Sequence, residues 1–186
     1  MNSTRRLSLA CAAIALALAV RADTGAEQAV ARAHVTHPPA PERQTAAQAH
    51  AKSTGCMSCH TATDRHTMHQ NPAVVLGCTD CHGGDAAVEK PAQAERQDLA
   101  YLAALEKSHV SPRYPKSWKW PSSANPEGSY TLLNREAPEY IRFVNPGDLR
   151  VAREACGACH LPIIQASERS LMSTSAMLWG GAAYNN

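Results

Sequence analysis

Three copies of one five-residue pattern hold most of the cysteines in this chain. The copies are Cys56-Met57-Ser58-Cys59-His60, Cys78-Thr79-Asp80-Cys81-His82 and Cys156-Gly157-Ala158-Cys159-His160, and they take six of the seven cysteines. Cys-x-x-Cys-His is the attachment signature of c-type haem. Its two thiols form thioethers with the porphyrin vinyl groups, and its histidine becomes the proximal axial ligand of the iron. The sequence therefore predicts three covalent haems, with His60, His82 and His160 as proximal ligands.

Two other uses of these cysteines stay open. The pairs Cys56/Cys59 and Cys78/Cys81 are separated by 18 residues, which also fits a structural zinc site. A zinc site leaves the histidine after each second cysteine unexplained, and it leaves the third copy without a partner. Disulfides are the other alternative in an exported protein, although bridges within Cys-x-x-Cys pairs would close only tiny loops.

Electron-transferring haems take a second axial ligand on the opposite face of the porphyrin. The candidates, in order of preference, are His69, His109, and then His66 or His50. His69 and His66 lie between the first two motifs, and His109 continues a stripe of leucines at helical spacing. Two further groups rank lower. The histidines expected at the surface are His34 and His37, and the methionines that could serve instead are Met68, Met172 and Met177. Met172 and Met177 are expected to be core or haem-packing residues.

The first 22 residues are typical of a secretory signal peptide. Arg5 and Arg6 precede an apolar run from Leu7 to Val20, and Val20-Arg21-Ala22 offers a cleavage site. Cleavage after Ala22 predicts a periplasmic or otherwise exported protein without a stable membrane anchor, and an uncleaved anchor or a lipid on Cys11 is the less favoured reading. Residues 23–50, with their proline-rich centre, are expected to form a flexible leader.

Composition adds two constraints. Removing the signal peptide with its three arginines leaves 15 Lys and Arg against 16 Asp and Glu, so nothing in the charge indicates nucleic-acid binding. The chain has one Phe, and aromatic residues are 5% of it. Burial of so few large apolar side chains offsets little of the conformational entropy that the chain loses on folding. We therefore expect haem faces to complete the packing and the haem-free protein to fold poorly.

Residues 51–186 are expected to form one trihaem domain of mainly α structure, with a high loop content and little or no β-sheet. It divides into a two-motif segment (51–90), a helix plus an aromatic loop (91–147) and the third-motif helices (148–186). The first helix is expected from Pro91 to about Ser108, with Leu99, Leu102 and Leu105 facing inward. The aromatic loop is expected to wrap haem edges, with a strand-like segment or helical turn at 140–144. Helices are also expected from an N-cap at Asp148 and over 163–178.

The motifs in their surroundings resemble exported bacterial multihaem c-type cytochromes. The resemblance lies in Gly55 to His60, Thr67-Met68-His69, Gly77 to Gly84, and Asn145-Pro146-Gly147-Asp148 before the third motif. It covers residues 52–186 and implies a small multihaem fold around three haem c groups. By analogy His69 and His109 are distal ligands. Members are often longer, so an N-terminal fragment of a longer member is also consistent with the resemblance.

The function expected from these features is electron transfer outside the cytoplasm, with other redox proteins as donor and acceptor. A carrier is favoured over an enzyme, because a haem with two axial ligands has no open position for a substrate. The alternative is the haem-relay portion of a larger multihaem oxidoreductase acting on small nitrogen or sulfur compounds, which needs one five-coordinate haem.

Overall fold

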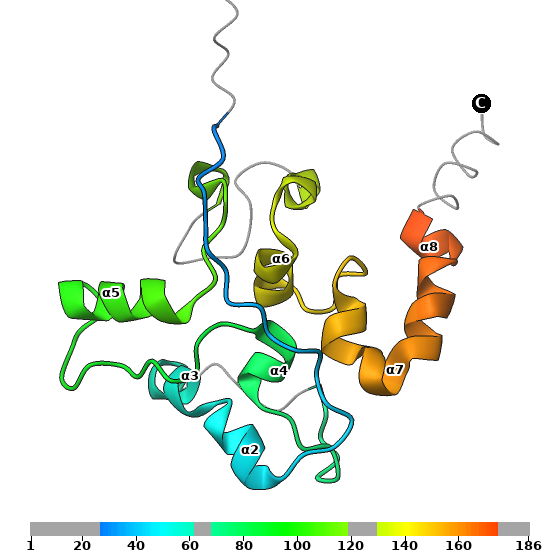
Figure 1. Ribbon diagram of the computed structural model, residues 1–186, viewed down its shortest axis with the longest axis horizontal. Coiled ribbons are helices and arrows are strands. Elements are labelled where there is room, and N and C mark those ends of the chain that lie inside the picture. The colour runs from blue at the N-terminus through cyan, green and yellow to red at the C-terminus, as the bar shows by residue number, and fades with distance from the viewer. Residues whose placement is uncertain (1–26, 62–67, 119–129, 175–186) are drawn as a thin grey trace, which may run out of the picture.

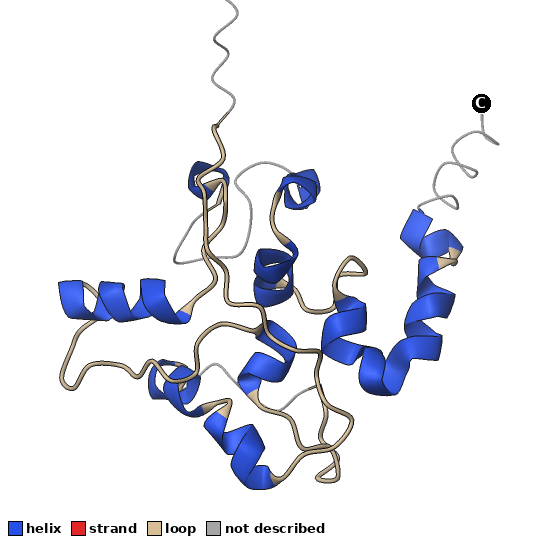
Figure 2. Ribbon diagram, viewed as in Figure 1, coloured by secondary structure: helices blue, strands red, loops and turns tan. Residues whose placement is uncertain are grey.

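The computed structural model describes residues 27–61, 68–118 and 130–174. Within these ranges the chain forms helices and loops and no strand (Figure 1, Figure 2). The expectation of a mainly helical chain with little or no sheet is confirmed for this part. The α-helices are α2 (Ala46–Ala51), α3 (Thr54–Cys59), α4 (Cys78–His82), α5 (Leu99–Ser108), α6 (Pro138–Val144), α7 (Ala152–Glu168) and α8 (Leu171–Thr174), with 3-10 turns at Pro115–Ser117 and Tyr130–Arg135. The expected signal peptide lies outside the described residues.

Helix α5 begins eight residues later than the sequence predicts. Residues 91–98 form turns, and Gln93 has a φ of 60°. This left-handed backbone conformation cannot continue a right-handed helix. Pro91 therefore opens a turn, with its carbonyl accepting from the Ala94 amide, and the helix starts only at Leu99.

The leucines of α5 do not face a protein core. Leu99 is 85% exposed and Leu102 is 41% exposed, and no residue of the helix is buried. The expected inward apolar face is therefore wrong for the polypeptide alone. The helix is positioned instead through its end, where its last residues lead into His109.

Helices α6 and α7 differ from expectation in their limits. The segment 140–144 is helical, because α6 begins earlier at Pro138. The predicted N-cap Asp148 precedes α7 by a turn, in which its carbonyl accepts from the amides of Val151 and Ala152. The expected break near Leu161 takes the form of a kink at His160, where φ is −114° and ψ is 15°, followed by Pro162.

The kink folds α7 back on itself. In a straight helix, Arg153 and Glu168 would stand about 22 Å apart at 1.5 Å per residue. Their side chains instead form a two-bond ion pair, from the Arg153 Nε and Nη2 atoms to the two Glu168 carboxylate oxygens. Pro162 supports the bend, since it lacks the amide hydrogen that a helix interior uses. The two limbs of α7 meet at a corner (Figure 1), and His160 is the residue with non-helical backbone angles at this kink.

A small core lies beside α6 and the start of α7. It contains Val110, Trp118, Leu133, Tyr140, Ile141 and Val151. The Trp118 and Tyr140 rings meet edge to face at 5.2 Å between centroids, and the Trp118 Nε1 donates to the buried Glu136 carboxylate at 2.8 Å. These aromatic residues of the loop thus pack against one another.

The middle motif helix, α4, occupies the centre of the fold. It packs against α6 and against α7, which carries the third motif (Figure 1). On its other side, the Cys78 amide donates to the Ser53 Oγ at 3.0 Å and the Thr79 amide to the Lys52 carbonyl at 3.2 Å. Both acceptors lie just before α3, which carries the first motif. The middle motif therefore contacts elements of both others.

Part of the segment expected as a flexible leader is fastened to this domain. The Val30 amide donates to the Arg113 carbonyl at 2.8 Å, and the Ala40 amide to the Glu154 carbonyl at 2.9 Å. Between them, the Arg142 guanidinium donates to the carbonyls of His37 and Pro38 at 3.2 and 3.0 Å. Residues 30–40 therefore run along the domain, from the aromatic core to α7.

Asp80, which occupies the second x position of the Cys-x-x-Cys-His pattern in the middle motif, anchors α4. Its side chain is 4% exposed and accepts from the Gly77 amide at 2.8 Å, the Gln44 Nε2 at 2.5 Å and the Lys52 Nζ at 2.6 Å. Burial alone would raise the pKa of Asp80, but these hydrogen bonds and the Lys52 charge outweigh burial and lower it. The carboxylate is thus held in its ionised form.

We expect Asp80→Ala to destabilise the protein by about 2 kcal/mol at neutral pH, because it strands the buried Gly77 amide and removes the ion pair of Lys52, whose ammonium keeps the Gln44 Oε1 as a partner. The lowered pKa contributes stability that is present above the unfolded pKa of about 4 and is lost as pH falls through the folded value. Urea unfolding at neutral and acidic pH should therefore show a gap between wild type and variant that narrows in acid. Asp148→Ala removes a surface ion pair with Arg150 and should cost less than about 1 kcal/mol.

Candidate functional site

The three motifs share one local geometry. In each, the two cysteines lie three residues apart on one helical turn, which puts both thiols on the same helix face. Regular helix ends at or next to the histidine in each copy: His60 caps α3, Gly83 follows His82 with a φ of 67°, and His160 forms the kink of α7. Each histidine is therefore released from the helix beside its two thiols. All three histidine residues are exposed in the polypeptide alone.

The His82 ring is oriented by a backbone carbonyl. Its Nδ1 lies 2.8 Å from the Phe143 carbonyl oxygen, which can only accept, so Nδ1 carries the hydrogen. In a neutral imidazole this leaves Nε2 with the lone pair, which is the form that binds a metal. An Nδ1–H···O=C hydrogen bond of this kind fixes the tautomer and raises the donor strength of the other nitrogen. The environment of His82 thus fits a metal-ligating histidine.

Two distant histidines lie opposite the motif histidines. The His60 and His109 rings are 6.2 Å apart between centroids, and the His69 and His160 rings are 6.1 Å apart. Two imidazoles that bind one metal ion from opposite sides stand at a similar centroid distance, about 6 Å, given metal–nitrogen bonds of about 2.0–2.1 Å, and this distance is also within the range of ordinary ring contact. The two best-ranked distal candidates are thus each brought to one motif histidine.

His109 has the protonation state that ligation needs. Burial, with a smaller contribution from the neighbouring His60 ring, lowers the pKa of His109 to about 4. The ring is therefore neutral at neutral pH. Since His109 caps the end of α5, the late start of that helix does not move it away from the first motif.

The motif cysteines lie close to one another across elements. Burial raises the pKa of Cys81, and the nearby Cys156 thiol raises it further. Burial also raises the pKa of Cys156, against the opposing charge of Arg142. At the first motif, burial raises the pKa of Tyr101 of α5, and the nearby Cys59 thiol raises it further. The second and third motifs are thus neighbours through Cys81 and Cys156, and α5 contacts the first.

The two alternative uses of the cysteines receive no support. The structure records the six motif cysteines as thiols. In the described ranges, no three His, Cys, Asp or Glu side chains converge as a metal cluster would, whereas a structural zinc ion takes four such ligands.

The remaining ligand candidates are not brought to a motif histidine, or they fall outside the described residues. His50 is exposed on α2 and contacts the Thr54 hydroxyl of the next helix at 3.3 Å. Met68 is 84% exposed and Met172 is 82% exposed, so the expectation of a core role for Met172 is wrong. His66 and Met177 lie outside the described residues.

His34 and His37 are not the exposed surface residues that the sequence suggested. Both are partly buried, and the Nε2 atom of each is buried without a hydrogen-bond partner in the described structure. The proline-rich composition around them predicted a solvated segment. The contacts that cover this segment come from residues far away in sequence, such as Arg142. The sequence around the two histidines gives no indication of such contacts.

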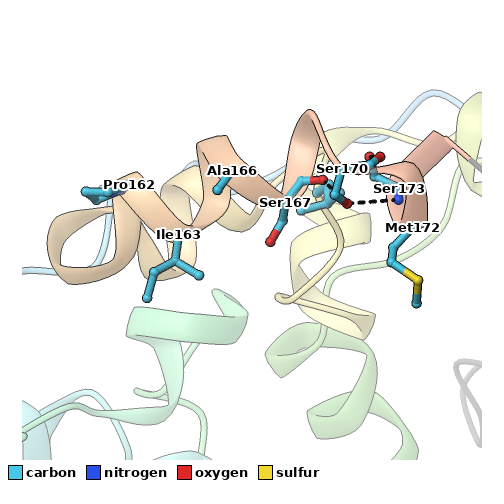
Figure 3. Close-up of a pocket in the computed structure, with 8 residues that line it drawn as sticks. Pro162, Ile163, Ala166, Ser167, Ser170, Met172 and Ser173 are labelled. Carbon is cyan, nitrogen blue, oxygen red and sulfur yellow. Dashed lines mark hydrogen bonds between the residues drawn. The ribbon is translucent and has the colours of Figure 1, made fainter.

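A groove lies beyond the third motif. Its volume is about 720 Å³, and it runs along the second limb of α7 and α8 (Figure 3). Pro162, Ile163 and Met172 give it an apolar lining, and serines 167, 170 and 173 add hydroxyl groups. Ile163 is 63% exposed there. The groove therefore leaves apolar side chains uncovered close to His160.

No helix in the described part of the chain is long and apolar enough to cross a membrane. Comparisons with protein-family models, with curated proteins and with solved structures gave no match to this chain. Function is therefore inferred from the residues and contacts described above.

Proposed function

We propose that this protein transfers electrons through three covalently bound c-type haems outside the cytoplasm. The observation that carries the proposal is the placement of His109 beside His60 and of His69 beside His160, each at a centroid distance similar to that of two imidazoles on one iron. Each pair combines a motif histidine with a histidine from a different element. Three Cys-x-x-Cys-His motifs with two such pairs support a set of haem sites better than a zinc module.

The residues fit the cofactor at several levels. The paired thiols on one helical turn would hold the porphyrin edge, and the adjacent histidine would bind the iron. The Phe143 carbonyl orients His82 for this role, and burial keeps His109 neutral. Exposed apolar side chains next to the motifs, such as Met57 at 46% and Leu161 at 39%, would be covered by a large flat apolar group.

Bound haem supplies a reversible one-electron couple at its iron. The chain's own residues determine how that couple is used. His109 and His69 would occupy the distal positions at two sites and exclude substrates from them. The motif helices hold the sites within one small fold, with α4 in contact with α6 and α7. We therefore propose a carrier that exchanges electrons with other redox proteins.

The deciding experiment counts the haems. Protein made in a host that matures c-type cytochromes should give close to three haems per chain in a pyridine haemochrome assay. Replacing both cysteines of one motif by alanine should lower the count by one, whichever motif is chosen. One haem or none in the wild type would overturn the proposal, and stoichiometric zinc in its place would favour the structural zinc site.

Carbon monoxide separates the carrier from the enzyme alternative. A carrier whose irons all have two axial ligands should show no spectral change with carbon monoxide. Binding at one haem per chain would instead identify an open iron, as a relay with a catalytic haem requires.

A further inference from the structure

We propose that Phe143 couples the first and second haem sites by contacting an axial ligand of each. This inference rests on the proposed function, since it concerns how electrons pass between haems held by the first two motifs. Phe143 is the only phenylalanine of the chain. It lies near the end of α6, and its ring contacts His109 at the end of α5 and His82 of the middle motif.

The contacts form a continuous series of rings. The Phe143 ring lies 5.0 Å from the His109 ring between centroids, and it meets the His82 ring edge to face at 6.5 Å. Both values are within the range of direct aromatic contact. His109 in turn faces His60. The series therefore runs from the first motif through His109 and Phe143 to the proximal histidine of the second motif.

The backbone of the same residue holds the second ligand. The Phe143 carbonyl accepts the Nδ1 hydrogen of His82 at 2.8 Å, which raises the donor strength of that imidazole toward iron. Phe143 thus contacts His82 in two ways. Its carbonyl affects the potential of the second haem, and its ring fills the space between the ligands of the two haems.

Phe143 is held rigidly in this position. Tyr140 and Ile141 of the same helix are buried in the core. Arg142 is 6% exposed, and its guanidinium donates to the Asp80 carbonyl at 2.6 Å and to the Cys81 carbonyl at 3.1 Å. Helix α6 is therefore bound directly to the helix of the middle motif, one residue before Phe143.

Gly84 allows the three elements to approach. A Cβ at Gly84 would lie 2.8 Å from the Ser108 carbonyl oxygen and 3.3 Å from the Phe143 ring. The φ of Gly84 is 82°, a value that residues other than glycine rarely adopt. Ser108 directly precedes His109. The absence of a side chain at Gly84 therefore lets His109 and Phe143 come into contact.

The process itself is a simple exchange. One electron leaves the reduced haem and is gained by its oxidised neighbour, and no bond or proton changes place. Electronic coupling weakens steeply across gaps, and truncating a packed side chain leaves such a gap. The Phe143 ring is therefore expected to increase the exchange rate between the first two haems, and to leave the exchange between the second and third unaffected.

The test uses the haem-loaded protein with Phe143→Leu and Phe143→Tyr. Two-dimensional exchange NMR on partly reduced protein, with assigned haem methyl signals, measures each pairwise exchange rate. Phe143→Leu keeps the backbone carbonyl, so the haem count and the potential of the second haem should be unchanged while exchange between the first two haems slows severalfold. Phe143→Tyr keeps the aromatic ring and should restore the rate. The exchange between the second and third haems is the internal control.

A matched glycine pair tests the same contact from the other side. Gly84→Ala pushes against Ser108 and Phe143, whereas Gly83→Ala also has a positive φ but would meet only the His37 ring, at 3.4 Å. Slower exchange in Gly84→Ala than in Gly83→Ala supports the proposal. Three haems with an unchanged rate in Phe143→Leu would overturn this inference alone, whereas a wild type without haems would overturn the proposed function.

Discussion

Replacing His109 with alanine is expected to leave three haems attached and to turn one of them from low-spin to high-spin. Attachment depends on the motif cysteines, which the substitution does not touch. The distal face of the first site, however, loses the imidazole that lies 6.2 Å from the His60 ring. The visible and electron paramagnetic resonance spectra should show one more high-spin iron per chain than the wild type, and carbon monoxide should bind to it.

The same substitution at His69 should open a different site, because His69 faces His160. The two pairs share no residue, so the double variant should show two more high-spin haems than the wild type. His50→Ala is the control, since His50 is exposed and contacts Thr54 instead. Added imidazole should fill the vacated position and restore the low-spin spectrum. Unchanged spectra in His109→Ala would contradict the assignment of that residue.

Arg142→Met is expected to have the largest effect on stability. The buried guanidinium donates to four backbone carbonyls, those of His37, Pro38, Asp80 and Cys81. Methionine has a similar length but no donor, so these carbonyls lose their partner at a cost of about 4 kcal/mol or more. Urea unfolding of the haem-loaded protein, followed by circular dichroism, measures the loss.

Two controls separate geometry from charge at this position. Arg142→Lys keeps the charge, but an ammonium cannot reach carbonyls spread around a planar guanidinium, so stability should recover only in part. Arg150→Met removes an exposed arginine that pairs with Asp148 and should cost less than about 1 kcal/mol. Equal losses in Arg142→Met and Arg150→Met would show that the four carbonyl contacts contribute little.

The features that depend on short spacing were predictable from the sequence. Two cysteines three residues apart share a helix face wherever the segment is helical, and the three motif segments are. The helical class followed in the same way from local patterns. His69 and His109 could be ranked as distal candidates because one lies between two motifs and the other ends an apolar stripe.

The features that depend on tertiary contacts were not predictable. Nothing local indicates that His109 faces His60 while His69 faces His160, since each pairing joins separate elements. The carbonyl that orients His82 belongs to Phe143, and a carbonyl has no sequence signal. The prediction that the helix starts at Pro91 was wrong. A proline favours a first helical turn without ensuring a second, and Gln93 has a left-handed backbone conformation there.

The attachment of residues 37–38 to Arg142 has a consequence for the order of events during synthesis. Ribosomes make chains from the amino end, so His37 emerges 105 residues before the guanidinium that binds its carbonyl. Until then the early segment has no fastening at this point, and loop closure over such a separation is slow compared with local helix formation. We therefore expect the thiols of the first two motifs to stay accessible until this long-range contact forms, and under the proposed function their attachment to haem after export would precede it.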